Sequence, residues 1–253
     1  MSTDITFATP TDSADKVTDN MAHLPSTQPL LATHSKNKPS ALIYEADIVL
    51  KTRIARYYFY RGGLPNGTGV IYFTKLVRSI WQAAAKDDPY ADLFLLRIYD
   101  ALVSIRRDIQ QQITHYNQLI DQKTRLKWKP AECANPSQIH LYFKLAYGYR
   151  AAEIIAEFDH YVNLIVSAKR YGILLEAPVH ELIEPMGEKI RHALDLPKQW
   201  QEINVTRDDI RQQNELAQQA QTLMGALNPQ ILAGTLRAPD APLNKKLKPM
   251  NNN

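Results

Sequence analysis

The stretch Gln138-Ile-His-Leu-Tyr-Phe-Lys-Leu145 alternates strictly between apolar and polar side chains. A period of two is typical of a β-strand with one buried face. The other face carries four side chains that can form hydrogen bonds and none that is acidic: Gln138, His140, Tyr142 and Lys144. The sequence therefore predicts a strand whose open face suits a hydrogen-bonding partner.

A long apolar helix is predicted directly after this strand. Gly148 interrupts the alternation, and residues 149–171 contain no further glycine or proline. Apolar side chains cover more than one stripe of this helix, which is typical of a helix that other elements surround. We therefore expect residues 149–171 to form the central core helix, around which the other segments pack.

The composition sets limits on the class of protein. The chain has 253 residues, of which 45% are hydrophobic and 22% charged, and its formal net charge is +4. This is enough for one good-sized core, and it permits nucleic-acid binding without requiring it. The single cysteine, Cys133, excludes an internal disulfide framework and fits a reducing compartment. Residues 1–20 lack the apolar part of a signal peptide and no stretch approaches a membrane span, so we expect a cytoplasmic protein.

Three segments are expected along the chain. Residues 1–38 are rich in small polar residues and proline, which predicts a disordered N-terminal tail. Residues 39–236 are predicted to form one mainly α domain, a helical bundle with one or two short strands. Residues 237–253 are rich in proline, lysine and asparagine and are predicted to form a flexible basic C-terminal tail.

A second alternating stretch, residues 42–52, begins this domain. It is followed by a short basic helix, for which Thr52 is a suitable N-cap and Gly62 a suitable end. The outward face of the stretch carries the acidic side chains Glu45 and Asp47. The sequence therefore predicts a second strand whose outer face is partly acidic.

The remaining helices are predicted from caps and periodicity. Asp88 and Pro89 open the longest one, which carries a heptad-like apolar seam. The seam fits a bundle helix within the chain or a dimeric coiled coil, and we favour the bundle because the other helices need partners. Thr206 begins a capping box with Asp209. The predicted helices span about residues 74–86, 88–126, 177–194 and 206–227.

Four cations follow one another just before the polar-faced strand: Lys123, Arg125, Lys127 and Lys129. Such a run is usually a solvated helix end that the helix dipole favours. Its position beside the strand makes contact with phosphates an equally good interpretation.

Patterns for catalysis and metal binding are weak. His180, Glu184, Glu188 and His192 are four residues apart, but Pro185 breaks their register and no second ligand helix matches. No nucleophile and base, no paired catalytic carboxylates and no nucleotide motif can be assembled. We therefore expect no enzymatic activity, no metal and no cofactor.

The segment Trp81-Gln-Ala-Ala-Ala-Lys-Asp-Asp-Pro-Tyr-Ala-Asp92 resembles a signature of the AcaB-type transcriptional regulators, which conjugative plasmids and integrating conjugative elements encode. Softer similarities lie at residues 147–159 and 223–239, and the resemblance covers about residues 40–242. It implies a DNA-binding regulator of conjugative transfer genes, with residues 39–236 as the DNA-binding and dimerisation domain. It also implies a ribbon-helix-helix-like reading element that dimerisation completes.

The resemblance implies partners as well. These are double-stranded promoter or operator DNA, a second copy of the chain in a homodimer, and RNA polymerase, with no membrane. Activation of transcription is the expected direction, and the residues themselves leave repression open.

Two segments compete for the role of reading strand. In a β-ribbon reader, alternate side chains point at base edges in the major groove. On residues 138–144, Gln138 suits adenine and Lys144 suits guanine, while His140 and Tyr142 add hydrogen bonds or stacking. We prefer this strand, together with the basic run before it and Arg150 after it.

The competing site is the earlier strand with the cations that follow it, Lys51, Arg53 and Arg56. Its strand and helix lengths fit a ribbon-helix-helix unit better, but Glu45 and Asp47 repel phosphates. A different class also stays open, a non-enzymatic accessory protein of the conjugation machinery whose basic strip contacts another protein.

Overall fold

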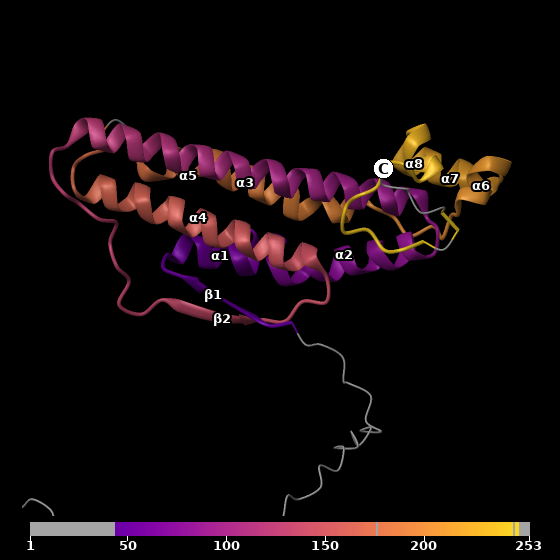
Figure 1. Cartoon of the computed structure of the whole chain (residues 1–253), viewed down its shortest axis with the longest axis horizontal. Coiled ribbons are helices and arrows are strands. Elements are labelled where there is room, and N and C mark those ends of the chain that lie inside the picture. The colour runs from indigo at the N-terminus through magenta and orange to yellow at the C-terminus, as the bar shows by residue number, and fades with distance from the viewer. Residues whose placement is uncertain (1–43, 176, 245, 248–253) are drawn as a thin grey trace, which may run out of the picture. The chain divides into compact units, whose positions relative to one another are not determined.

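The computed structural model describes residues 44–175, 177–244 and 246–247, and the tail predicted at residues 1–38 lies outside them. Most of the described residues are helical, which confirms the expected mainly α class (Figure 1). In chain order the elements are β1 (Ala46–Leu50), α1 (Arg53–Arg61), α2 (Val70–Ala85), α3 (Pro89–Lys123), β2 (Ser137–Leu141), α4 (Ala146–Arg170), α5 (Val179–Asp195), the 3-10 helix η1 (Leu196–Gln199), α6 (Arg207–Gln212), α7 (Glu215–Met224) and α8 (Pro229–Ala233).

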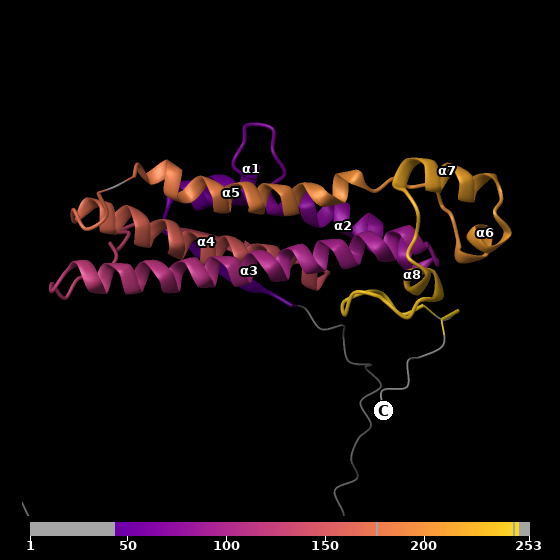
Figure 2. The ribbon, with the colours of Figure 1, turned by 90° about the horizontal axis from the view of Figure 1, so that it is seen from above.

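Helices α3, α4 and α5 pack side by side as a bundle (Figures 1 and 2). Most of the seam of α3 is buried inside the chain, as the bundle interpretation predicts. Helix α4 contacts α1, α2, α3, α5 and β1, and buried residues lie on most of its sides. It is therefore the central core helix that its apolar pattern predicts. In the described part of the chain, no helix combines the length and apolar character that crossing a bilayer requires.

The two predicted strands pair with each other. β1 runs antiparallel to β2, with Ile48 opposite Ile139 and Asp47 opposite His140. The inward side chains Ile48 and Leu141 are buried in the core. We call this pair of strands the ribbon. The ribbon was expected to be completed by a second copy of the chain, and here both of its strands come from one chain.

Local sequence sets both ends of α1 and the start of α3 as predicted. The hydroxyl of Thr52 accepts a hydrogen bond from the N–H of Ala55, and Gly62 ends α1 in the left-handed conformation with φ of 58°. Asp88 caps α3 by accepting hydrogen bonds from N–H groups of its first turn. The capping box of Thr206 and Asp209 is also present, at the start of α6.

Several boundaries differ from the prediction, and three of them have a clear local reason. Helix α2 begins at Val70 and not near residue 74, because Gly69 serves as an N-cap without a side-chain signal. Gly148 lies inside the first turn of α4, where a Cβ would come within 2.6 Å of the ring of Phe143. It therefore permits close packing and does not break the helix. The helix predicted over residues 206–227 is split by Gln213, whose positive φ of 53° ends α6.

The signature segment forms the turn between α2 and α3 and carries a buried ion network. The guanidinium of Arg207, 1% exposed, donates to Asp87 Oδ1 at 2.9 Å and to Asp92 Oδ2 at 2.6 Å. Arg237 donates to the other oxygen of Asp92 at 2.8 Å. These bonds fasten α6 and the segment after α8 to the α2–α3 turn.

Residues 237–244, assigned by their composition to the flexible tail, make several contacts with the bundle. Ala238 is buried in the core. The backbone oxygen of Asp240 accepts a hydrogen bond from the indole of Trp81, and its carboxylate pairs with Arg150 at 3.0 Å. This part of the C-terminal segment is therefore bonded to α2 and α4.

Candidate nucleic-acid interface

A carboxylate of the core helix fixes the junction between β1 and α1. Asp159, which is 4% exposed, accepts hydrogen bonds from the N–H groups of Lys51 and Thr52, both at 2.8 Å, and from the Thr52 hydroxyl at 2.7 Å. These three donors satisfy a charge whose burial is otherwise costly. Helix α4 therefore fixes the orientation of the ribbon relative to α1.

Tyr149, also on α4, holds the opposite end of the ribbon. Its hydroxyl donates to the backbone oxygen of Tyr44 at 2.6 Å and accepts from the N–H of Phe143 at 3.1 Å. Its ring packs edge-on against Phe143 at 5.2 Å between centroids. The ribbon is thus tied to the core helix at both ends, which makes it a fixed platform for its outward side chains.

The outward face of the ribbon carries residues from both strands. Gln138 and His140 are exposed there, as their alternation predicts, and Asp47 lies directly across from His140. β2 ends at Leu141, before the predicted residue 145, so Tyr142 is exposed just beyond the strand. His140 Nδ1 is 2.9 Å from Asp47 Oδ1, and its Nε2 is 3.8 Å from a carboxylate oxygen of Glu45. The acidic residues that counted against the earlier strand therefore lie on the same surface as the preferred residues. The two candidate strands form one ribbon and share its outward face.

The charge of His140 depends on these neighbours. The hydrogen bond to Asp47 raises the pKa of His140 above its ordinary value, and the negative charge of Glu45 adds to this. The protonated imidazole partly neutralises the two carboxylates. The centre of the ribbon face therefore stays net negative even when His140 is charged, because one cation faces two carboxylates.

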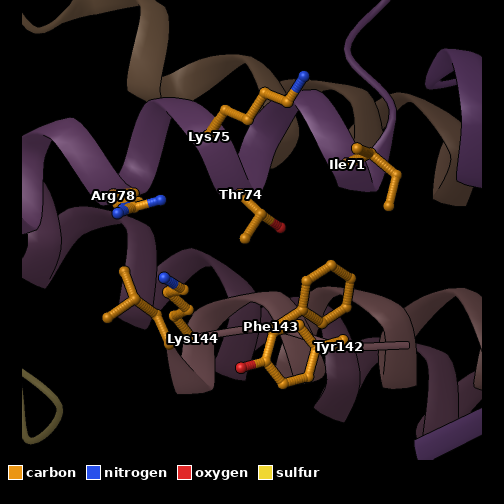
Figure 3. A pocket seen from close by; sticks show the side chains of 8 residues that line it. Ile71, Thr74, Lys75, Arg78, Tyr142, Phe143 and Lys144 are labelled. Carbon is orange, nitrogen blue, oxygen red and sulfur yellow. The ribbon is translucent and has the colours of Figure 1, made fainter. Parts of the chain in front are cut away.

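A hollow of about 240 Å³ lies between α2 and residues 142–145, which follow β2, and several cations line it (Figure 3). We call it the α2–β2 hollow. It is lined by Ile71, Thr74, Lys75, Arg78, Tyr142, Phe143, Lys144 and Leu145, with no acidic residue among them. Arg78 and Lys144 are both exposed, and no ion pair joins either to a carboxylate of the described residues.

A second cationic surface lies on α1. Arg53, Arg56 and Arg61 line a wide hollow of about 730 Å³ together with Tyr57 and Tyr60. The guanidinium of Arg56 lies 5.4 Å from the centre of the Tyr60 ring. Two of the predicted competing residues, Arg53 and Arg56, therefore share an exposed face with aromatic rings.

The predicted basic run lies between α3 and β2. Arg125, Lys127 and Lys129 are exposed there, and so is Lys123 at the end of α3. Trp128, between two of these cations, packs on Tyr171 at 5.9 Å. Further along, Ala131 is held through its N–H by Ser167 at 2.8 Å and through its oxygen by Asn163 at 3.0 Å. Helix α4 therefore anchors this loop as well.

Two of the predicted contact residues already form ion pairs with other residues of the chain. Lys51 pairs with Glu132 at 3.0 Å. Arg150 pairs with Asp240 and lies 5.2 Å from the centre of the Tyr99 ring. Both cations are already neutralised by a neighbour, and they are weaker candidates than their sequence positions indicate.

The cations of α2 were not among the predicted contact residues. Ile71, Lys75 and Arg78 recur at steps of four and three, so they form one exposed stripe of the helix. The spacing was readable, but nothing in the sequence placed this stripe beside Lys144. That proximity depends on how the end of β2 packs.

The metal pattern on α5 has a different explanation. Helix α5 continues through Pro185, so the expected break in register is wrong. Arg191 instead pairs with Glu184 at 2.5 Å and lies 3.9 Å from Glu188. Among the residues that the structure describes, no group of three or more metal-binding side chains converges on one point.

The comparisons with known proteins agree on one family. Residues 41–244 match the family model described as "Transcriptional regulator AcaB". The fold is similar to the crystal structure of selenomethionine-containing AcaB from uropathogenic E. coli, with a TM-score of 0.53 and 10% sequence identity. That similarity covers 77% of this chain and 97% of the other. No curated protein sequence matches the chain.

Proposed function

Because the chain belongs to the family of AcaB transcriptional regulators, we propose that it binds duplex DNA sequence-specifically through the outward face of the ribbon. The observation that carries this proposal is the ribbon itself, an antiparallel pair with a buried inner face and polar side chains outside, tied to α4 at both ends. A two-stranded ribbon fits the major groove, where side chains can reach base edges.

The residues of the ribbon have different roles in this proposal. Gln138 and Tyr142 contact bases directly, since both are exposed and neither has a hydrogen-bonded side chain among the described residues. His140 contributes in its protonated form, alongside Asp47. Lys127 and Lys129 contact phosphates, which position the protein without reading sequence.

The wider role follows from the family. We propose that the protein acts as a homodimer on promoter or operator DNA of conjugative transfer genes and activates their transcription with RNA polymerase. A dimer would place two ribbons on two half-sites of a symmetric operator. Sedimentation with and without duplex measures the dimer, and a monomer on the operator would contradict it.

The binding experiment compares two duplexes. Fluorescence anisotropy is measured for the full chain on a fragment from upstream of the transfer genes of its own element and on a scrambled duplex, over a series of salt concentrations. We expect steep salt dependence on both, because bound cations displace counterions, and tighter binding to the first. Undetectable binding, or binding that salt does not alter, would contradict the proposal.

Matched variants then separate reading from attraction. Gln138→Ala and Tyr142→Ala are expected to cost about 1–3 kcal/mol on the specific duplex and less on the scrambled one. Lys127→Ala and Lys129→Ala weaken binding to both duplexes alike. If the ribbon variants bind the specific duplex normally while Arg53→Ala and Arg56→Ala abolish discrimination, α1 is the reading surface.

One observation favours the alternative of an accessory protein in the conjugation machinery. The ribbon face also carries Glu45, Asp47 and the exposed apolar side chain of Val49, a mixture that suits a protein partner. The anisotropy series distinguishes the two functions, because an accessory protein of this kind has no need to prefer one duplex over the other.

A further inference from the structure

The α2–β2 hollow joins two segments that are far apart in the sequence. Arg78 comes from the middle of α2, and Lys144 lies three residues beyond the end of β2. Figure 3 shows Arg78 and Thr74 facing the hollow from α2, with Lys144, Phe143 and Tyr142 opposite them. With Lys75, three cations thus line one small space that has no acidic residue, and Arg78 and Lys144 approach it from its two sides.

The chemistry of the hollow suits a phosphate. The guanidinium of Arg78 presents parallel N–H donors that match phosphate oxygens, and Lys144 adds an ammonium group. Thr74 already donates its hydrogen to the backbone oxygen of Val70 at 2.7 Å, so the cations carry the attraction for an anion. The apolar side chains of Ile71 and Phe143 lower the local dielectric constant, which strengthens attraction between the cations and an anion.

The position of the hollow indicates the source of the phosphate. Lys144 and Tyr142 continue the chain from β2, so the hollow borders the end of the ribbon. A duplex that receives the ribbon in its major groove passes its own backbone beyond the ends of the strands. We propose that the α2–β2 hollow binds a phosphate of the DNA backbone and so sets the register of the ribbon. This rests on the proposed DNA binding and adds α2 to the interface.

The test measures the salt dependence of binding for Arg78→Ala, Lys144→Ala and the double variant. Each single variant is expected to weaken binding to specific and scrambled duplexes by the same factor. Each also lowers the slope of log affinity against log salt, by up to about one unit per protomer bound. The loss in the double variant is smaller than the sum of the single losses, because both cations serve one phosphate.

Lys86→Ala is the matched control. Lys86 is an exposed cation at the C-cap of the same helix, about two turns beyond Arg78 and outside the hollow. Its replacement leaves the salt slope unchanged. Arg78→Lys, which keeps the charge, retains most of the slope. An unchanged thermal midpoint in all variants excludes unfolding as the cause.

The outcomes separate this site from DNA binding as a whole. If the wild type binds with a steep salt slope and Arg78→Ala and Lys144→Ala keep that slope, the phosphate site is wrong and the DNA-binding proposal stands. If the wild type binds no duplex, both are wrong. A third arm measures the thermal midpoint of the wild type as inorganic phosphate is added. If millimolar phosphate raises that midpoint while Arg78→Ala leaves DNA binding unchanged, the hollow binds a small ligand and the proposed contact with the DNA backbone is wrong.

Discussion

Two groups of charged side chains in this protein differ in what surrounds them. At the α2–α3 turn, Asp92 and Arg207 are sealed from solvent and paired with each other. At the α2–β2 hollow, Arg78 and Lys144 are exposed, and the described residues offer them no carboxylate. Buried, paired charges fix how elements meet, whereas exposed, unpaired ones remain available to an outside anion. The most recognisable segment of the sequence, residues 81–92, belongs to the first group.

The largest expected effect is on folding. Arg207→Ala leaves the carboxylates of Asp87 and Asp92 buried without this partner, and breaking such a pair costs about 3–5 kcal/mol in the free energy of unfolding. Urea denaturation measures it. Arg78→Ala, the contrasting change, stays within about 0.5 kcal/mol of the wild type, since it removes an exposed side chain. If both variants lost similar free energies of unfolding, the two groups of charges would not differ in their contribution to stability.

The second effect is a pH dependence of stability that arises from Asp88, in the same turn. Burial raises the pKa of Asp88 to about 6, and its Oδ2 has no hydrogen-bond partner among the described residues. The unfolded chain has the ordinary pKa of about 3.9, so between these values the folded state binds more protons. The contribution of Asp88 to stability is therefore full at low pH and falls as pH rises from about 4 to 6, by at most about 3 kcal/mol.

Asp88→Asn tests this dependence. Its side-chain oxygen can still cap α3, while the titrating group is gone. Unfolding free energies of wild type and variant are compared at pH 4.5 and pH 7.5. We expect the difference to move in favour of the variant at the higher pH. A difference that does not change with pH would mean that Asp88 titrates normally.

A smaller effect is expected on the ribbon face. Glu45→Gln removes a negative charge that phosphates approach, and exposed charge pairs of this kind are worth about 0.2–1 kcal/mol. Binding to both the specific and the scrambled duplex should tighten by a few-fold at low salt. If only the specific duplex is affected, and binding to it weakens, Glu45 contacts a base and does not repel the backbone.

The smallest effect is a change in one titration. His140 gains its raised pKa first from the hydrogen bond with Asp47, so Asp47→Asn should return that pKa toward its ordinary value. Nuclear magnetic resonance of the imidazole follows this directly. Any stability from the pair is present below the unfolded pKa and is lost as pH rises through the folded one. An unchanged His140 titration would show that Asp47 is not its main partner.

Local sequence predicted much of the fold. The caps at Thr52, Asp88 and Thr206 and the apolar coverage of α4 depend on near neighbours, and each was readable from the chain. The α2 start at Gly69 was not, because a cap without a side chain leaves no signal. The break between α6 and α7 was not predicted, because a left-handed backbone is expected at glycine and here it occurs at Gln213.

The candidate site was less predictable, because it depends on long-range pairing. Alternation showed which side chains of each strand point outward, but not that β1 pairs with β2 and brings Asp47 beside His140. In the sequence, Arg150 looks like a cation that is free to bind DNA. The structure shows that it forms an ion pair with Asp240, which is distant in the sequence. Charge in a sequence is therefore informative about an interface only after its partners are known.

The most direct test of the ribbon as the DNA-binding face is a site-specific photo-cross-link. p-Benzoylphenylalanine replaces Tyr142 on the ribbon side, Tyr60 on α1 or Leu223 on α7, which are exposed by 56%, 48% and 49%. Each protein is irradiated with the labelled upstream duplex. We expect a cross-link from position 142 that unlabelled specific duplex suppresses, and none from position 223. Cross-linking from position 60 with none from position 142 would contradict it.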